Sequence, residues 1–238
     1  MSRRELPAIT LGTYYTTRGG YSRPNDSTMR NYVYIAKDDY SISGVTIEHP
    51  RHPKKKPRLI KTPVDAHEYF AEIIRAHKTR IYERLGIDTG YPITLVPIPT
   101  SQTTRATLGA ARWPGRDIAT ALEREGFGKV MPALAFKNAR QSKHARGPSL
   151  KAHELYAELE VVEKPDEDDT IVLIDDVITW GEHVAAADAC FVNGNVVALA
   201  VATTGSDLRD AYEPRHRVIS YDRSKTSWDV TIADREVE

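Results

Sequence analysis

Residues 170–203 constrain the fold more than any other part of this sequence. Residues 171–174 form a continuous apolar run, and residues 196–203 form a second one. Between them, residues 182–192 are typical of a helix, which Asn193, Gly194 and Asn195 would end. A strand, a helix and a second fully apolar strand are typical of a parallel sheet covered on both faces. The sequence therefore predicts an α/β protein.

Other segments predict further elements around this unit. A helix is expected over residues 65–85, with Asp65 as its cap and Gly86 as its stop. A second helix would begin at Trp113 and Pro114. The expected strands, identified by β-branched and aromatic residues or by apolar runs, are residues 32–35, 42–47, 93–99, 130–136, 156–162, 218–221 and 228–232.

Two adjacent carboxylates, Asp175 and Asp176, directly follow the first apolar run. In an open α/β sheet, ligands bind at the carboxyl ends of the strands. The following turn and helix start offer free N–H groups, which favour a phosphate. The carboxylates could accept hydrogen bonds from sugar hydroxyls and hold Mg²⁺, directly or through water. The residues therefore predict a pocket for a phosphorylated sugar.

This stretch, residues 171–183, resembles the phosphoribosyl-diphosphate (PRPP) binding motif of type I phosphoribosyltransferases. The resemblance implies a parallel-sheet, Rossmann-like core and a catalytic, magnesium-associated role for Asp175 and Asp176, which would bind the ribose 2- and 3-hydroxyls. Trp180 and His183 depart from the small or hydroxyl residues of the motif. The alternative is an ordinary strand-to-helix turn with capping acids. The residues that would bind the 5-phosphate are Val177, Ile178, Thr179, Trp180, Gly181, Glu182 and His183.

Residues 96–101, Val-Pro-Ile-Pro-Thr-Ser, resemble the pyrophosphate loop of the same family, particularly in its competence-associated members. The resemblance implies that Thr100, Ser101, Arg105 and Arg112 bind pyrophosphate. The basic segment 137–151 occupies the position of the family's mobile catalytic loop. The cations that would close over the diphosphate are Lys137, Arg140, Lys143 and Arg146; for all the arginines and lysines named here, a solvated surface position is the alternative.

The resemblance also implies a division of the chain. Residues 61–205 would form the phosphoribosyltransferase-like core. Residues 1–60, expected to be a β-rich extension, and residues 206–238, a second β extension, would supply the hood that receives a nucleobase in this family.

The chain's net charge of zero, from 33 basic and 33 acidic side chains, conceals an asymmetry. Residues 1–60 carry 11 Lys and Arg against 5 Asp and Glu, whereas residues 161–238 carry 7 against 17. Residues 100–151 carry 10 against 3. A basic loop region facing an acidic pair suits PRPP, a small and highly anionic ligand.

These features predict a Mg²⁺-dependent transfer of the 5-phosphoribosyl group from PRPP to a nitrogen nucleophile, a base or amine, with release of pyrophosphate. One alternative is a non-catalytic nucleotide-binding module, which Trp180 and His183 favour. Another is a nucleic-acid-associated protein, which the basic front and the run Lys54, Lys55 and Lys56 motivate. A homodimer remains open.

Several other classes are disfavoured. The sequence contains no apolar run of the roughly 18 residues that a membrane span needs. Met1 to Glu5 lack a signal-peptide core, and Cys190 is the single cysteine, so a reducing cytoplasm is expected. No histidine spacing matches a zinc site with thiolates.

Overall fold

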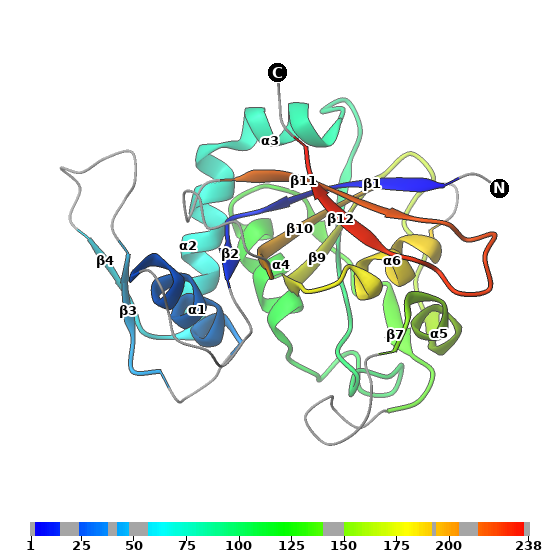
Figure 1. The fold of residues 1–238 in the computed structure, drawn as a ribbon, viewed down its shortest axis with the longest axis horizontal. Helices are drawn as coiled ribbons and strands as arrows, with labels where there is room; N and C mark the ends of the chain where they lie inside the picture. The colour runs from blue at the N-terminus through cyan, green and yellow to red at the C-terminus, as the bar shows by residue number, and fades with distance from the viewer. Residues whose placement is uncertain are drawn as a thin grey trace.

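The computed structural model describes residues 3–14, 24–37, 42–47, 57–139, 150–191, 194–204 and 214–235 (Figure 1). The six helices of these residues are α1 (Pro24–Ala36), α2 (Pro63–Ala76), α3 (Lys78–Leu85), α4 (Pro114–Arg124), α5 (Ala152–Glu158) and α6 (Glu182–Ala189). The strands are β1 (Arg4–Thr10), β2 (Thr13–Tyr14), β3 (Val45–Ile47), β4 (Arg58–Ile60), β5 (Ile93–Pro97), β6 (Lys129–Val130), β7 (Leu134–Phe136), β8 (Leu159–Val161), β9 (Thr170–Ile178), β10 (Asn195–Thr204), β11 (Arg215–Tyr221) and β12 (Thr231–Asp234).

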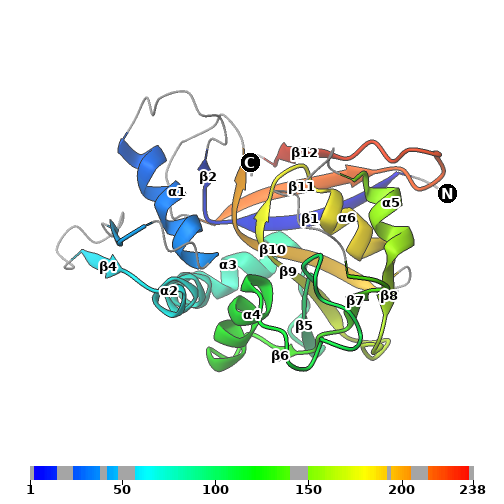
Figure 2. The same cartoon turned by 90° about the horizontal axis from the view of Figure 1, so that it is seen from below.

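The central sheet has the strand order β12-β11-β1-β10-β9-β5-β6, with β2 paired to β10 (Figure 2). The pairs from β1 through β10, β9 and β5 to β6 are parallel, whereas β11 and β12 form an antiparallel edge. The fold is therefore mixed α/β with a largely parallel sheet, as the apolar strands predict, and it is compatible with a phosphoribosyltransferase-like core.

Helices cover both faces of this sheet. Residues of α1, α2, α3 and α4 pack in one hydrophobic cluster with alternate residues of the central strands. Residues of α6 pack against the other face, and α5 packs on α6. Within the described part of the chain, no helix has the length and apolar character that a membrane crossing requires.

The strand β9 extends further than the apolar run predicts. It continues through the acid pair to Ile178, because Val177 and Ile178 are buried and pair with Ala202 and Thr203 of β10. The carboxylates consequently lie on a strand that neighbouring strands hold on both sides, and not on a free loop.

The hood expected from the chain termini is not confirmed. β1 lies inside the main sheet, parallel to β10 and antiparallel to β11. Both C-terminal strands belong to the same sheet. The terminal segments therefore contribute to the central layer that positions the acid pair, while the proposed domain boundaries remain untested.

The strand predicted at residues 32–35 is wrong, because these residues belong to α1. Met29, Tyr32, Val33 and Ala36 are buried at helical spacing, and the Tyr32 hydroxyl donates to the Ala66 carbonyl at 2.7 Å. This amphipathic spacing outweighs the local β preference of the tyrosine and valine residues. The neighbouring strand prediction is confirmed in part by β3.

The helix predicted over residues 65–85 is two helices, which meet at His77. Thr62, and not Asp65, is the cap of α2: the Asp65 N–H donates to its hydroxyl, and the Asp65 carboxylate accepts from the Thr62 N–H. Gly86 ends α3 in a left-handed conformation, with φ of 67°, as predicted.

Two strand predictions before β9 were too long. Residues 130–136 are divided between β6 and β7, with Pro132, which has no N–H to donate, between them. Most of residues 156–162 is divided between α5 and β8.

Candidate functional site

The acid pair lies at the centre of the sheet's carboxyl edge. Asp175 stands beside Ala200 of β10, and the neighbouring Ile174 pairs with Pro97 at the end of β5. Asp175 and Asp176 are both half-buried. One Asp175 carboxylate oxygen accepts the Asp176 N–H at 2.9 Å, and one Asp176 oxygen accepts the Val177 N–H at 2.8 Å. These contacts fix the carboxylates and leave further oxygens for a ligand.

The negative charge of Asp176 disfavours ionisation of Asp175. Burial, followed by the neighbouring charge of Asp176, raises the pKa of Asp175 well above its ordinary value. The positive charge of Lys37 acts in the opposite direction. A cation or a hydrogen-bond donor placed here would therefore stabilise the ionised pair.

Lys37, directly after α1, supplies one such charge. Its Nζ lies 3.3 Å from an Asp176 carboxylate oxygen. The N-terminal region thereby reaches the acid pair. Sequence reasoning missed this lysine, because no local pattern links residue 37 to residue 176.

The loop after β9 leads directly into α6. Gly181 adopts a left-handed conformation, with φ of 79°, and precedes the first residue of the helix. The Ala185 N–H donates to the Gly181 carbonyl at 2.8 Å, so the N–H groups of Glu182, His183 and Val184 have no acceptor within the helix. A helix start of this kind favours an anion.

Two threonines at the end of β10 hold this loop in position. The Thr203 hydroxyl donates to the Ile178 carbonyl at 2.8 Å, and the Thr204 hydroxyl donates to the Thr179 carbonyl at 2.9 Å. The loop is therefore fixed from the neighbouring parallel strand.

Gly181 also lies against the C-terminal strands. A Cβ atom at this position would lie 3.0 Å from Cγ1 of Val230 and 3.2 Å from Cγ2 of Ile219. Both the backbone conformation and the space therefore favour glycine here. The C-terminal strands support the loop from behind, a role that the sequence did not indicate.

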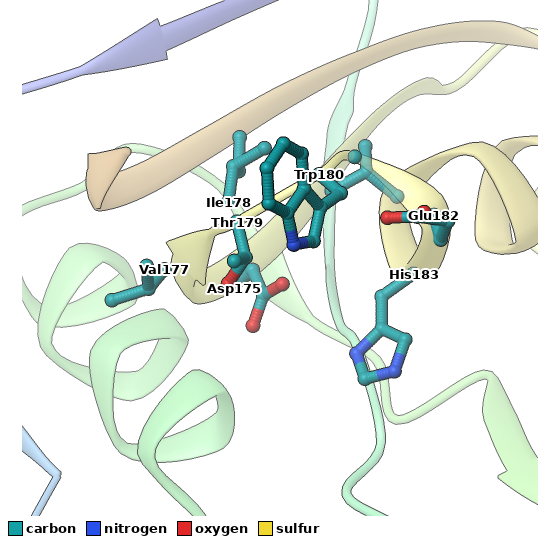
Figure 3. Close-up of a pocket in the computed structure, with 9 residues that line it drawn as sticks. Asp175, Val177, Ile178, Thr179, Trp180, Glu182 and His183 are labelled. Carbon is teal, nitrogen blue, oxygen red and sulfur yellow. The ribbon is translucent and has the colours of Figure 1, made fainter. Parts of the chain in front are cut away.

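A cavity of about 30 Å³ is lined by Asp175 and by residues 177–184 (Figure 3). It brings together one carboxylate of the acid pair and all seven residues predicted to bind a 5-phosphate. The Trp180 side chain is 65% exposed, and it points to a different side of the loop from the His183 imidazole. The indole therefore borders the cavity without being packed into the core.

The loop after β5 begins beside the acid pair. The Ile98 N–H donates to the Ile174 carbonyl at 2.9 Å, and Thr100 and Ser101 follow. A Cβ atom at Gly115 would lie 3.0 Å from the Ile174 carbonyl oxygen. The absence of a side chain at Gly115 thus lets the start of α4 approach the ends of β5 and β9.

The two predicted pyrophosphate arginines differ in their surroundings. Arg105 is exposed on the loop. The Arg112 guanidinium lies 3.3 Å from the Asp117 carboxylate and is mostly exposed. Both arginines lie on the segment between β5 and α4, and their roles remain predictions.

Lys137 is the one member of the predicted mobile loop set that lies in the described residues. Its Nζ donates to the Ala157 carbonyl of α5 at 2.5 Å. Arg140, Lys143 and Arg146 lie outside the described residues. The catalytic role of this loop therefore stays a prediction.

A second cavity, of about 440 Å³, adjoins Lys37. Its lining includes His67, Arg112 and Trp113, from α2 and from the segment that leads into α4. The His67 ring nitrogen Nε2 lies 2.8 Å from the Ala36 carbonyl oxygen, and burial lowers the pKa of His67. Because Lys37 also contacts Asp176, this cavity is connected to the acid pair through one side chain.

The donor chemistry of the acid pair suits magnesium. Carboxylate oxygens are ligands that Mg²⁺ prefers, and the ion commonly keeps several waters and contacts substrate phosphates. Among the described residues, no cluster of three or more His, Cys, Asp or Glu side chains could hold a metal by itself. The pair therefore fits an ion whose remaining ligands come from water and a bound diphosphate.

Comparison with solved structures gives a weak likeness of fold. No protein-family model and no curated protein matches the chain. The chain is similar to a crystal structure of a hypoxanthine phosphoribosyltransferase from Staphylococcus aureus, with 11% identity and a TM-score of 0.33 over 62% of this chain and 72% of that chain. A likeness of this strength says nothing about substrate.

Proposed function

We propose that this chain binds PRPP with Mg²⁺ and transfers the phosphoribosyl group to a nitrogen nucleophile. The observation that carries the proposal is the cavity at the carboxyl edge of β9, where Asp175 and the first turn of α6 share one lining. This lining supports the proposal, because a carboxylate can accept hydrogen bonds from sugar hydroxyls and a helix start favours a phosphate.

In this proposal, Asp175 and Asp176 accept hydrogen bonds from the ribose 2- and 3-hydroxyls. The backbone from Thr179 to His183 binds the 5-phosphate. The nucleophile's nitrogen forms a bond to the anomeric carbon while the bond from that carbon to the diphosphate oxygen breaks. Magnesium, when bound, supplies positive charge to the diphosphate and the acid pair. The chain's own task is to position the reactants and stabilise the leaving group.

The diphosphate would lie toward the loop after β5, where Thr100, Ser101 and Arg105 are placed. The acceptor would enter through the second cavity, because Lys37 borders it and also contacts Asp176. The lining of this cavity mixes polar and apolar residues and does not select one class of acceptor.

Calorimetry with PRPP and Mg²⁺ tests binding. Asp175→Asn and Asp176→Asn should each weaken binding roughly 10- to 100-fold, the effect of losing a hydrogen bond to a charged group. Asp168→Asn, at an exposed loop position, is the matched control and should bind like the unaltered chain. Absence of binding, or equal binding by all variants, would contradict the proposal.

A non-catalytic binding module is the second candidate. Two features favour it. The exposed Trp180 side chain borders the proposed phosphate site, and Lys37 already pairs with the Asp176 carboxylate. Pyrophosphate release should be measured with PRPP, Mg²⁺ and a panel of purine, pyrimidine and amine acceptors. PRPP binding without release for any acceptor would favour the module over the transferase.

A further inference from the structure

A large depression lies away from the acid pair, between α3 and the strands β1 and β11. Its volume is about 800 Å³, and its lining includes Pro7, Leu85 and His216. Leu85 packs in the cluster that contains Ile9, on one face of the sheet, whereas α6 packs on the other. Figure 1 shows α3 and α6 on opposite sides of β1. No residue of this depression lines the cavity at the acid pair.

Positive charge dominates the rim of this depression. Arg80, Arg84 and Arg235 line it, and Glu83 is the acidic residue among its lining residues. Arg80 and Arg235 are exposed. The Arg84 guanidinium donates to the Pro214 carbonyl at 3.2 Å, which holds it at the rim. Three arginines, two from α3 and one directly after β12, thus line one concave surface.

His216 adds a buried polar group to the lining. It lies on β11 and is 8% exposed, and its Nε2 has no hydrogen-bond partner among the described residues. Burial, followed by the positive charges of Arg235 and Arg84, lowers the pKa of His216. An unpaired buried ring nitrogen is unfavourable, and a nearby anion would offset the two guanidinium charges. Neighbouring side chains screen Nε2 from solvent, so a direct contact needs one of them to move.

We propose that this depression binds a small phosphate-bearing molecule of nucleotide size. Guanidinium groups match phosphate geometry with paired N–H donors. The volume falls in the usual range for small-molecule sites, and Pro7 and Leu85 offer apolar contact to an organic moiety. Glu83 on the rim disfavours a long polyanion, and the apolar contacts favour a small organic ligand. The site is independent of the proposed transfer reaction.

Calorimetry with ATP and with inorganic diphosphate as probes tests this site. Both probes are added to the full chain, and any binding at the loop after β9 is distinguished by its independence of Arg84 and Arg235. Both probes should bind, and Arg84→Gln and Arg235→Gln should each weaken binding about tenfold, as for the loss of a charge-assisted hydrogen bond. Arg124→Gln on α4, an exposed arginine outside the depression, should bind like its parent.

A second readout uses the His216 imidazole. Its NMR signals are identified by their loss in His216→Gln. Adding diphosphate should raise the pKa of His216, because the bound anion offsets the charges of Arg84 and Arg235. Glu83 and Arg80 line the same rim.

Three results would overturn the proposal. The first is no binding of either probe. The second is equal weakening by Arg124→Gln, which would indicate attraction by net charge alone. The third is binding of a DNA duplex with the same arginine dependence but no binding of ATP, which would assign the surface to nucleic acid instead.

Discussion

The Lys37 ammonium nitrogen lies 3.3 Å from an Asp176 carboxylate oxygen, and so joins the end of α1 to the acid pair at the centre of the sheet. The charge of Lys37 also favours the ionised form of Asp175. Because the site is half-buried, the charge of Lys37 influences whether a ligand meets Asp175 in its ionised or its protonated form.

Replacing Lys37 with methionine should therefore raise the pKa of Asp175 further, because the ionised carboxylate loses a nearby positive charge. Carboxyl carbon chemical shifts followed against pH measure this. Lys61→Met removes an exposed lysine that lines neither cavity and should leave the Asp175 titration unchanged. An unchanged pKa in Lys37→Met would show that the ion pair does not act on Asp175.

Asp175→Asn should stabilise the ligand-free fold at neutral pH. The folded-state pKa of Asp175 is raised above 3.8, its ordinary value, so ionisation opposes folding above the raised pKa. This unfavourable contribution disappears as pH falls from the raised pKa toward 3.8. Thermal unfolding should show a higher Tm for Asp175→Asn at pH 7 and a shrinking difference in acid.

The exposed variant Asp168→Asn serves as the control for this effect and should have the Tm of the unaltered chain at each pH. A lower Tm for Asp175→Asn at pH 7 would contradict the prediction. The expected gain in stability together with the expected loss of PRPP binding would mark Asp175 as a residue kept for binding at a cost in stability.

Gly181→Ala should destabilise the fold more than Gly86→Ala. Both glycines have positive φ, for which a side chain costs roughly 1–2 kcal/mol. A Cβ atom at Gly86 would meet nothing within 4 Å, whereas one at Gly181 would press on Val230 and Ile219. Denaturant unfolding measures both, and PRPP affinity should fall only in Gly181→Ala. Equal losses of stability would show that the C-terminal strands yield freely.

Thr203→Val should cost roughly 1–3 kcal/mol of unfolding free energy and weaken PRPP binding, because the Ile178 carbonyl loses its hydroxyl donor. Thr10→Val is the matched comparison. The Thr10 hydroxyl is fully buried and has no hydrogen-bond partner among the described residues, so its removal should be neutral or stabilising. Similar losses in both variants would indicate a packing effect of valine.

The elements around the acid pair could be predicted from the sequence because their signals are local. The apolar run before Asp175 and the glycine turn into α6 need only neighbouring residues to be recognised. β1 could not be predicted, because its partner residues in β10 and β11 lie about 190 to 220 positions further along the chain. Residues 32–35 of α1 are predicted as a strand because Tyr32 and Val33 favour strands locally, whereas their burial follows a helical period.

The contacts that shape the candidate site are mostly long-range. Lys37 at Asp176 and Val230 at Gly181 join residues with no common sequence pattern. The sequence therefore identified the groups that carry the proposed chemistry, but not the segments that position them.

The placement of β1 has a consequence for biosynthesis. Both of its partner strands, β10 and β11, come from the last 45 residues of the chain. During translation, β1 therefore cannot pair with β10 and β11 until residues 195–221 have left the ribosome. Val230, which lies against Gly181, is synthesised after both of these strands. A nascent chain that ends before Val230 should consequently lack part of the support for the loop after β9.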